Sequence, residues 1–181
     1  MLVYAAMLSG YFDDAAETPW GNLKKGLIDL VISLGIAFTY YFYNGSQVKL
    51  YITDSTFTIP APLFIILAGV LVWTAINVTN CTDGVDGLCS SLVMTVLLPL
   101  AFMVTKSGAA DMLLPMIMFV TLAAYLWFNC SPSQMLMGDA GSRALGVFLA
   151  VMFLKTAAPF AFIPMAIVII LDGGLGLLLS L

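Results

Sequence analysis

The residues best suited to chemistry in this sequence are carboxylates and amides grouped in three short polar segments. Residues 77–87 read Asn-Val-Thr-Asn-Cys-Thr-Asp-Gly-Val-Asp-Gly, residues 137–142 read Met-Gly-Asp-Ala-Gly-Ser, and residues 13–14 are a pair of aspartates. Long apolar stretches separate these segments. Carboxylates at the edge of an apolar medium are costly to leave unpaired. We therefore expect a divalent cation with oxygen ligands, shared with a phosphate-bearing substrate.

The spacing within residues 77–87 suits a binding site. Asn77 and Asn80 are three residues apart, so they share one face at the end of a helix. Two glycines let the backbone turn tightly, and Asp83 and Asp86 project from neighbouring turns. We interpret these amides and carboxylates as a site for a nucleotide's polar edges and a metal ion. An Asx-rich turn that caps the next helix is the alternative.

In residues 137–142, glycines flank Asp139 at the start of an apolar stretch. The backbone N–H groups of a helix N-terminus favour anions, and Asp139 beside them can hold Mg²⁺ that bridges to a diphosphate. The alternative is an ordinary N-cap made by Asp139 or Ser142.

The third segment, Asp13 and Asp14, needs a cation nearby, because adjacent carboxylates raise each other's pKa. Lys24 and Lys25 follow in the same connection and can meet substrate phosphates as point charges. Asp29 lies near the start of the next apolar stretch, where we expect it to be solvated.

The low charge content classifies the chain as a polytopic membrane protein. It is 62% hydrophobic and 9% charged, whereas soluble domains carry about 25% charged residues. The net charge of −4 argues against nucleic acid as a partner. The absence of histidine excludes zinc sites and histidine acid–base chemistry within these residues.

The expected fold class is all-α, a polytopic membrane helical bundle of one domain over residues 1–181. The apolar lengths predict six spans plus the tail of an earlier one in residues 1–12. The six are residues 26–43, 59–76, 88–105, 112–128, 144–158 and 160 to the end. Residues 47–59 alternate with period two and predict a short β-hairpin on the membrane surface. We expect the chain to be truncated at both ends, since it stops inside an apolar run.

Counting crossings predicts that the three acidic segments share one face of the membrane. An even number of crossings separates each segment from the next, and connections alternate sides. Three of the six basic residues fall on each face. The positive-inside rule is therefore tied and does not orient the chain.

The motifs resemble the polyprenyl-phosphate N-acetylhexosamine-1-phosphate transferase superfamily. Its pattern includes an Asp-Asp pair, an Asn-x-x-Asn-x-Thr-Asp-Gly-x-Asp-Gly run and Met-Gly-Asp-x-Gly-Ser-x-Ala-Leu-Gly. Residues 13–14, 77–87 and 137–146 match these three in order and spacing. Thr82 before Asp83, and Ala-Leu-Gly at the end of the last run, favour the muramoyl-pentapeptide branch over the N-acetylglucosamine branches.

The resemblance implies transfer of phospho-MurNAc-pentapeptide from its UDP-linked donor to undecaprenyl phosphate, giving lipid I and UMP. It also implies Mg²⁺ as cofactor, about ten helices, a homodimer, and an active site on the cytoplasmic face of the bacterial plasma membrane. We predict catalytic roles for Asp13, Asp14, Asp83 and Asp139, with Asp139 as the metal ligand. We predict substrate binding by Asn77, Asn80, Asp86, Lys25, Asn129 and Ser142.

The sequence also departs from the family pattern. Glu17 stands where the family often has lysine, and Lys25 can substitute from farther along the chain. Leu136 replaces an aromatic residue that often stacks on uracil, and the family's histidine-rich loop is absent. We expect the 181 residues alone to be inactive. The alternatives are a sister transferase that uses UDP-GlcNAc and a cation-binding membrane transporter, which would need ionisable groups deep within its spans.

Overall fold

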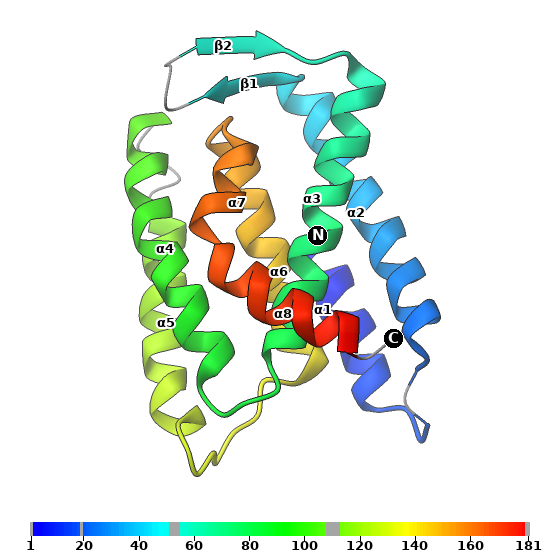
Figure 1. Ribbon diagram of the computed structural model, residues 1–181, viewed down its shortest axis with the longest axis vertical. Coiled ribbons are helices and arrows are strands. Elements are labelled where there is room, and N and C mark those ends of the chain that lie inside the picture. Colours follow the sequence, from blue (N-terminus) through cyan, green and yellow to red (C-terminus); the bar gives the residue numbers. More distant parts are fainter. Residues whose placement is uncertain (1, 19, 51–54, 108–112, 180–181) are drawn as a thin grey trace.

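The computed structural model describes residues 2–18, 20–50, 55–107 and 113–179, most of which are helical (Figure 1). The first helices are α1 (Leu2–Asp14), α2 (Asn22–Asn44), α3 (Ala61–Thr82) and α4 (Leu88–Ser107). The later helices are α5 (Leu113–Asn129), α6 (Gly138–Lys155), the short α7 (Phe162–Met165) and α8 (Ile167–Leu179). The predicted helical class is therefore confirmed.

Helix α6 lies at the centre of the bundle, where it packs against α1, α3 and α4. Two glycines permit the close approach of its neighbours. A Cβ at Gly146 would lie 2.6 Å from the carbonyl oxygen of Ala75 in α3, and one at Gly10 in α1 would overlap the backbone of Asp139. Small residues at helix contacts are the usual means of close packing in membrane bundles. The first turn of α6 is thus held directly against α1.

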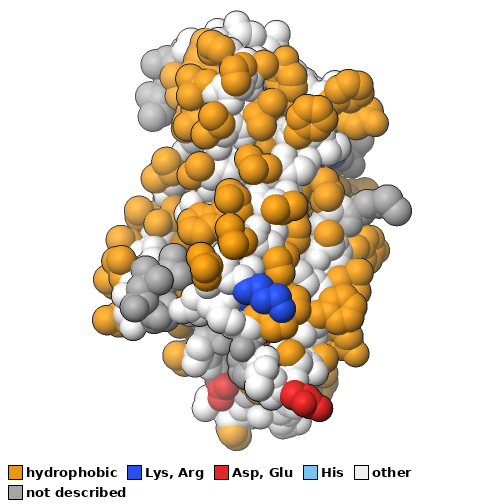
Figure 2. Space-filling model, turned by 90° about the vertical axis from the view of Figure 1, so that its right-hand side faces the viewer, with side chains coloured by type: hydrophobic (Ala, Val, Ile, Leu, Met, Phe, Trp, Pro, Cys, Tyr) orange, Lys and Arg blue, Asp and Glu red, His pale blue; other side chains and the backbone are white. Residues whose placement is uncertain are grey.

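Two helices, α2 and α3, are long and apolar enough to cross a membrane, and a bent helix pair near the C-terminus makes at most a third. The apolar parts of α4 and α5 are shorter, Leu88–Val104 and Leu113–Asn129. Figure 2 shows that hydrophobic side chains cover most of one face of the molecule. The structure therefore has two or three candidate spans among its described residues, while the predicted total of six remains a prediction.

The span predicted from residue 160 onward is bent in the structure. The chain bends by 75° between Pro159–Met165 and Ile167–Gly176. Pro159 begins the 3-10 turn before α7 and a second proline lies inside α7, so two backbone N–H donors are missing near the bend. Beyond the bend, α8 packs against α3, where a Cβ at Gly173 would overlap the backbone of Val78. The bend thus lays α8 across the bundle beside the lower half of α3 (Figure 1).

The predicted surface hairpin is present at the end of the bundle opposite the α3–α4 connection (Figure 1). Strands β1 (Gln47–Leu50) and β2 (Ser55–Thr58) pair antiparallel, with Val48 opposite Phe57. Val48 is fully buried, and the N–H of Lys49 donates to the carbonyl of Ala157 at 2.6 Å. These contacts attach the hairpin to the end of α6. The turn of the predicted hairpin, residues 51–54, lies outside the described residues.

Candidate active site

The three acidic segments meet at one end of the bundle. Asp13 and Asp14 end α1, residues 77–87 cover the end of α3 and the whole α3–α4 connection, and residues 137–142 begin α6. All three lie opposite the hairpin (Figure 1). Segments far apart in the sequence therefore contribute side chains to one small volume, which we call the acidic site.

Asp139 is the most connected carboxylate of the acidic site. Its Oδ1 accepts a hydrogen bond from Asn80 Nδ2 at 3.0 Å, and its Oδ2 accepts from Lys25 Nζ at 3.1 Å and Arg143 Nη2 at 3.3 Å. Asn80 Nδ2 also lies 3.0 Å from Ser142 Oγ, which itself donates to the carbonyl of Gly138. The end of α3 is thereby joined to the first turn of α6.

Lys25 connects two of the predicted catalytic carboxylates. Its Nζ lies 2.5 Å from Asp13 Oδ2 and 3.1 Å from Asp139 Oδ2. Asp13 is only 5% exposed, and its Oδ1 accepts from the N–H of Trp20 at 2.8 Å. A single ammonium group therefore neutralises carboxylates from α1 and α6, and its position beside them suits the phosphate contact predicted for it.

Asp14 caps the N-terminus of α6. Its Oδ1 and Oδ2 accept from the backbone N–H groups of Asp139 and Ala140, each at 3.3 Å. The alternative prediction, a cap by Asp139 or Ser142, is wrong, because Ser142 bonds to the carbonyl of Gly138 instead. Gly138 has φ +64°, and a Cβ there would lie 2.7 Å from Asp14 Oδ2. The helix end that favours anions is thus occupied by a carboxylate of the chain itself.

Asp83 follows the last residue of α3 and faces the same carboxylates. Burial raises its pKa to about 6, and the charges of Asp139 and Asp14 add to the rise, while a backbone hydrogen bond from Gly138 opposes it. At and below about pH 6, a proton on Asp83 limits the repulsion inside the acidic site.

Three predicted binding residues lie outside this group of contacts. Asn77 Nδ2 donates to the carbonyl of Trp73 at 2.9 Å, so the residue faces the α2 side of α3. Asp86 Oδ2 accepts from the N–H of Ser133 at 3.2 Å. Asn129 is 3% exposed, and its Oδ1 accepts from the N–H of Gly87 at 3.0 Å. Asp86 and Asn129 hold the α5–α6 connection against residues 83–87, and their roles toward substrate remain predictions.

A buried ion pair beneath the acidic site was missed by the sequence analysis. Asp29 is 1% exposed and lies 3.3 Å from Arg143 Nη1, so the expectation that Asp29 is solvated is wrong. A helical spacing of four residues separates Asp29 from Lys25 and Arg143 from Asp139. That spacing puts each pair on one helix face and is the sequence signal that could have revealed the contact.

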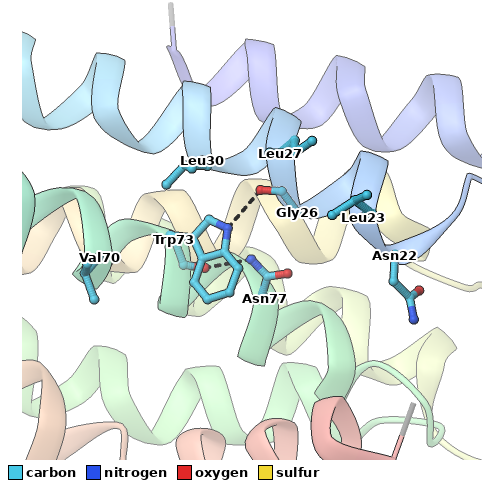
Figure 3. Close-up of a pocket in the computed structure, with 8 residues that line it drawn as sticks. All are labelled: Asn22, Leu23, Gly26, Leu27, Leu30, Val70, Trp73 and Asn77. Carbon is cyan, nitrogen blue, oxygen red and sulfur yellow. Dashed lines mark hydrogen bonds between the residues drawn. The ribbon is translucent and has the colours of Figure 1, made fainter. Parts of the chain in front are cut away.

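An apolar cavity of about 510 Å³ opens between α2 and α3 and reaches the acidic end (Figure 3). The Trp73 indole crosses it and donates from Nε1 to the carbonyl of Gly26 at 3.0 Å. Its lining residues are Asn22, Leu23, Gly26, Leu27, Leu30, Val70, Trp73 and Asn77. Gly26 neighbours Lys25 in sequence, and Asn77 lies one turn before Asn80, so the cavity and the acidic site adjoin each other.

The donor set of the acidic site fits a hard divalent cation. Asp13 and Asp139 are paired with both Lys25 and Arg143, and Asp29 is paired with Arg143. The carboxylates of Asp14 and Asp83 lie close to Asp139. Magnesium prefers oxygen ligands and is commonly held by one or two carboxylates together with substrate phosphates. Within the described residues no three metal-binding side chains converge as a preformed cage. The carboxylates beside Asp139 could therefore supply one or two ligands to such a cation, with water or phosphate oxygens as the others.

Comparison with known proteins identifies the family of the chain. A family model described as glycosyl transferase family 4 matches residues 1–157. The phospho-N-acetylmuramoyl-pentapeptide-transferase of Treponema pallidum (strain Nichols) is 39% identical over 98% of this chain and 54% of its own length. Proteins of the same name from Streptococcus sanguinis and Fervidobacterium nodosum are 33% and 30% identical, over 78% and 74% of this chain and 45% and 41% of their own lengths.

The chain thus spans about half the length of the curated relatives that it matches. Their shared name confirms the resemblance to the muramoyl-pentapeptide branch that the three motifs predicted. On the match over residues 1–157, the chain belongs to glycosyl transferase family 4.

Proposed function

We propose that the protein carrying this chain transfers phospho-MurNAc-pentapeptide from UDP-MurNAc-pentapeptide to undecaprenyl phosphate, giving lipid I and UMP in peptidoglycan synthesis. The family match and the name shared by the relatives support the reaction class. The observation that carries the proposal is the convergence of Asn80, Lys25 and Asp13 on Asp139, which gathers residues from four helices at a polar end of an apolar bundle.

The reaction exchanges one phosphoanhydride for another. An oxygen of the lipid phosphate attacks the β-phosphorus of the nucleotide sugar, and the bond from that phosphorus to the bridging oxygen breaks. UMP leaves with the bridging oxygen. A phosphate monoester has a second pKa of about 6, so the attacking group is already mostly dianionic at neutral pH. A strong general base is therefore not required, and both direct attack and an aspartyl-phosphate route suit these carboxylates.

Positioning and charge neutralisation are then the main tasks of the side chains. Lys25 would bind substrate phosphate beside Asp13 and Asp139, while Asn80 holds the Asp139 carboxylate in one orientation. Asp139, with Asp13, Asp14 and Asp83 near it, would hold Mg²⁺. When bound, that ion supplies shielding of diphosphate charge and stabilisation of the leaving nucleotide.

The apolar cavity between α2 and α3 is our candidate for the first part of the polyprenyl chain. Leucine, valine and tryptophan side chains line it, together with Asn22 and Asn77 (Figure 3). Its lining residue Gly26 follows Lys25 in α2. A phosphate at the acidic site would leave the attached isoprenoid beside this cavity. Apolar surface of this kind at a membrane-facing helix pair suits a lipid tail.

The number of membrane crossings, the orientation of the chain and its oligomeric state are also proposals. Six crossings would put the three acidic segments on one face of the membrane. We propose that this face is the cytoplasmic face of the bacterial plasma membrane, because UDP-linked precursors are available there, and that the whole protein acts as a homodimer. The inactivity expected of a 181-residue polypeptide of this sequence stays a prediction.

Side-by-side substrate competition tests the proposal. Membranes containing the native protein that carries this sequence would receive undecaprenyl phosphate, Mg²⁺ and either radiolabelled UDP-MurNAc-pentapeptide or radiolabelled UDP-GlcNAc. We expect label to enter the lipid fraction, with UMP released, from the muramoyl donor. Labelling from UDP-GlcNAc alone would replace the proposal with the sister transferase. Absence of lipid labelling from both donors would contradict transferase activity.

A further inference from the structure

The guanidinium of Arg143 lies inside the bundle next to the acidic site, and its two ends have different partners. Nη1 is 3.3 Å from Asp29 Oδ1 and 3.4 Å from Ser9 Oγ. Nη2 is 3.3 Å from Asp139 Oδ2 and 3.6 Å from Asp13 Oδ2. One end of the fork is therefore anchored in the bundle interior, and the other end faces the predicted catalytic carboxylates.

Both ends of the guanidinium need partners because the side chain is buried. Arg143 and Asp29 are each only 1% exposed, and a buried charge is tolerated only when it is paired and hydrogen-bonded. Asp29 comes from α2 and Ser9 from α1, so the anchor draws on a helix that packs against α6 and on a second helix that packs against α1 and α3. The planar fork of arginine can serve both ends at once, which a lysine ammonium cannot.

We propose that Asp29 is a positioning residue for Asp139 and that it acts through Arg143. The inference rests on the proposed function, because Asp139 is the carboxylate that would hold Mg²⁺. With Nη1 fixed by Asp29 and Ser9, Nη2 meets Oδ2 of Asp139 while Asn80 holds Oδ1. Both oxygens of the carboxylate are thereby held in one orientation before a cation arrives.

Loss of the anchor has a definite consequence. A guanidinium without Asp29 is free to turn both of its ends toward Asp13 and Asp139, as arginine does in bidentate carboxylate pairs. Those contacts compete with a metal ion for the same oxygens. Asp29→Asn should therefore weaken cation binding even though Asp29 lies behind Arg143 as seen from Asp139.

A double-mutant cycle with Mn²⁺ as the probe tests the inference. The free Mn²⁺ signal in electron paramagnetic resonance would give the Kd of the native protein, of Asp29→Asn, of Arg143→Met and of the double variant. We expect Asp29→Asn to raise the Kd about 10-fold, the range found for residues that orient metal ligands. In the Arg143→Met background we expect the same change to have less than about a twofold effect. Equal effects in both backgrounds would mean that the charge of Asp29 acts on the cation at a distance, without Arg143, and would overturn the inference.

Ser9→Ala keeps the test decisive if Arg143→Met fails to fold. This change removes the second partner of Nη1 without altering charge, so a field effect cannot explain its outcome. We expect the Kd for Mn²⁺ to rise roughly twofold to tenfold, the effect of one hydrogen bond. An unchanged Kd in Ser9→Ala would overturn the inference.

A matched control and a separate assay distinguish this inference from the proposed function. Asp172→Asn removes an exposed carboxylate on α8 and should leave the Kd unchanged. If the cycle shows coupling but the native protein releases no UMP, the transferase proposal fails and the positioning role stands. If the native protein binds no Mn²⁺, both proposals fail.

Discussion

Asn80 and Asp139 are joined by a 3.0 Å hydrogen bond that connects the end of α3 to the first turn of α6. The bond unites two motifs that lie 59 residues apart in the sequence. It also gives Asn80 a role that does not require direct contact with substrate, because the amide fixes the orientation of a carboxylate proposed to bind the metal.

Replacement of Asn80 by alanine should lower the rate of UMP release by about 10-fold to 100-fold, since it frees Oδ1 of Asp139. Initial rates in membranes and thermal melting would be measured together. Asn44→Ala is the matched control, because Asn44 lies exposed at the other end of the bundle, where it donates to its own helix. An Asn80→Ala enzyme as active as the native one would contradict the proposed role of this bond.

Gly138→Ala should disrupt the start of α6. The residue has φ +64°, which costs an alanine roughly 1–2 kcal/mol, and the new Cβ would lie 2.7 Å from Asp14 Oδ2. We expect lower thermal stability together with lower activity. Gly174→Ala is the control, since a Cβ there meets nothing within 4 Å. Equal melting temperatures for the two variants would show that the Asp14 cap tolerates displacement.

The raised pKa of Asp83 predicts a pH dependence of stability. Burial and the charges of Asp139 and Asp14 raise the pKa from 3.8 to about 6, so the folded protein binds more protons than the unfolded chain between these values. The contribution of Asp83 to stability therefore falls as pH rises through this window. In buffer without divalent cations, Asp83→Asn should remove this part of the slope between pH 4 and about 6.

Melting temperatures of native protein and Asp83→Asn across that pH range provide the measurement. Parallel curves would contradict the assigned burial of Asp83. Activity gives an independent readout, because the same variant should lose UMP release while it gains stability near neutral pH, as expected where a site is strained for function.

Trp73→Ala should affect the lipid substrate selectively. The indole crosses the α2–α3 cavity, so its removal alters the proposed contact with the polyprenyl chain but not the acidic site. We expect a higher KM for undecaprenyl phosphate with the KM for the UDP-linked donor unchanged. Steady-state kinetics with each substrate varied in turn would test this. A change confined to the donor KM would place the lipid elsewhere.

Much of the fold follows from the lengths of the apolar runs. Helices α2 and α3 contain nearly all of the predicted spans at residues 26–43 and 59–76, and the period-two pattern predicted the hairpin. The bend before Ile167 was not predictable in this way, because apolar residues continue without interruption through it. The packing of α8 on α3 is a tertiary contact, which the hydropathy of the sequence does not predict.

The acidic site, like the fold, was predictable from the sequence only in part. Crossing parity predicted that the three acidic segments share one side, and the structure brings them to one end of the bundle. The Asp14 cap on α6 depends on which helices are neighbours, and no local pattern encodes that. For the Arg143–Asp29 pair, the four-residue spacings to Asp139 and Lys25 were the available sequence signal. Glu17 and Leu136 depart from the family pattern, so the site residues alone did not determine the substrate.

The most direct test of the account is the rate of Mg²⁺-dependent UMP release by an Asp139→Asn variant of the native protein, with UDP-MurNAc-pentapeptide and undecaprenyl phosphate as substrates. The account predicts a loss of about 100-fold or more in a variant that remains folded, because a ligand of the proposed Mg²⁺ is removed. Native turnover by the folded variant would contradict it.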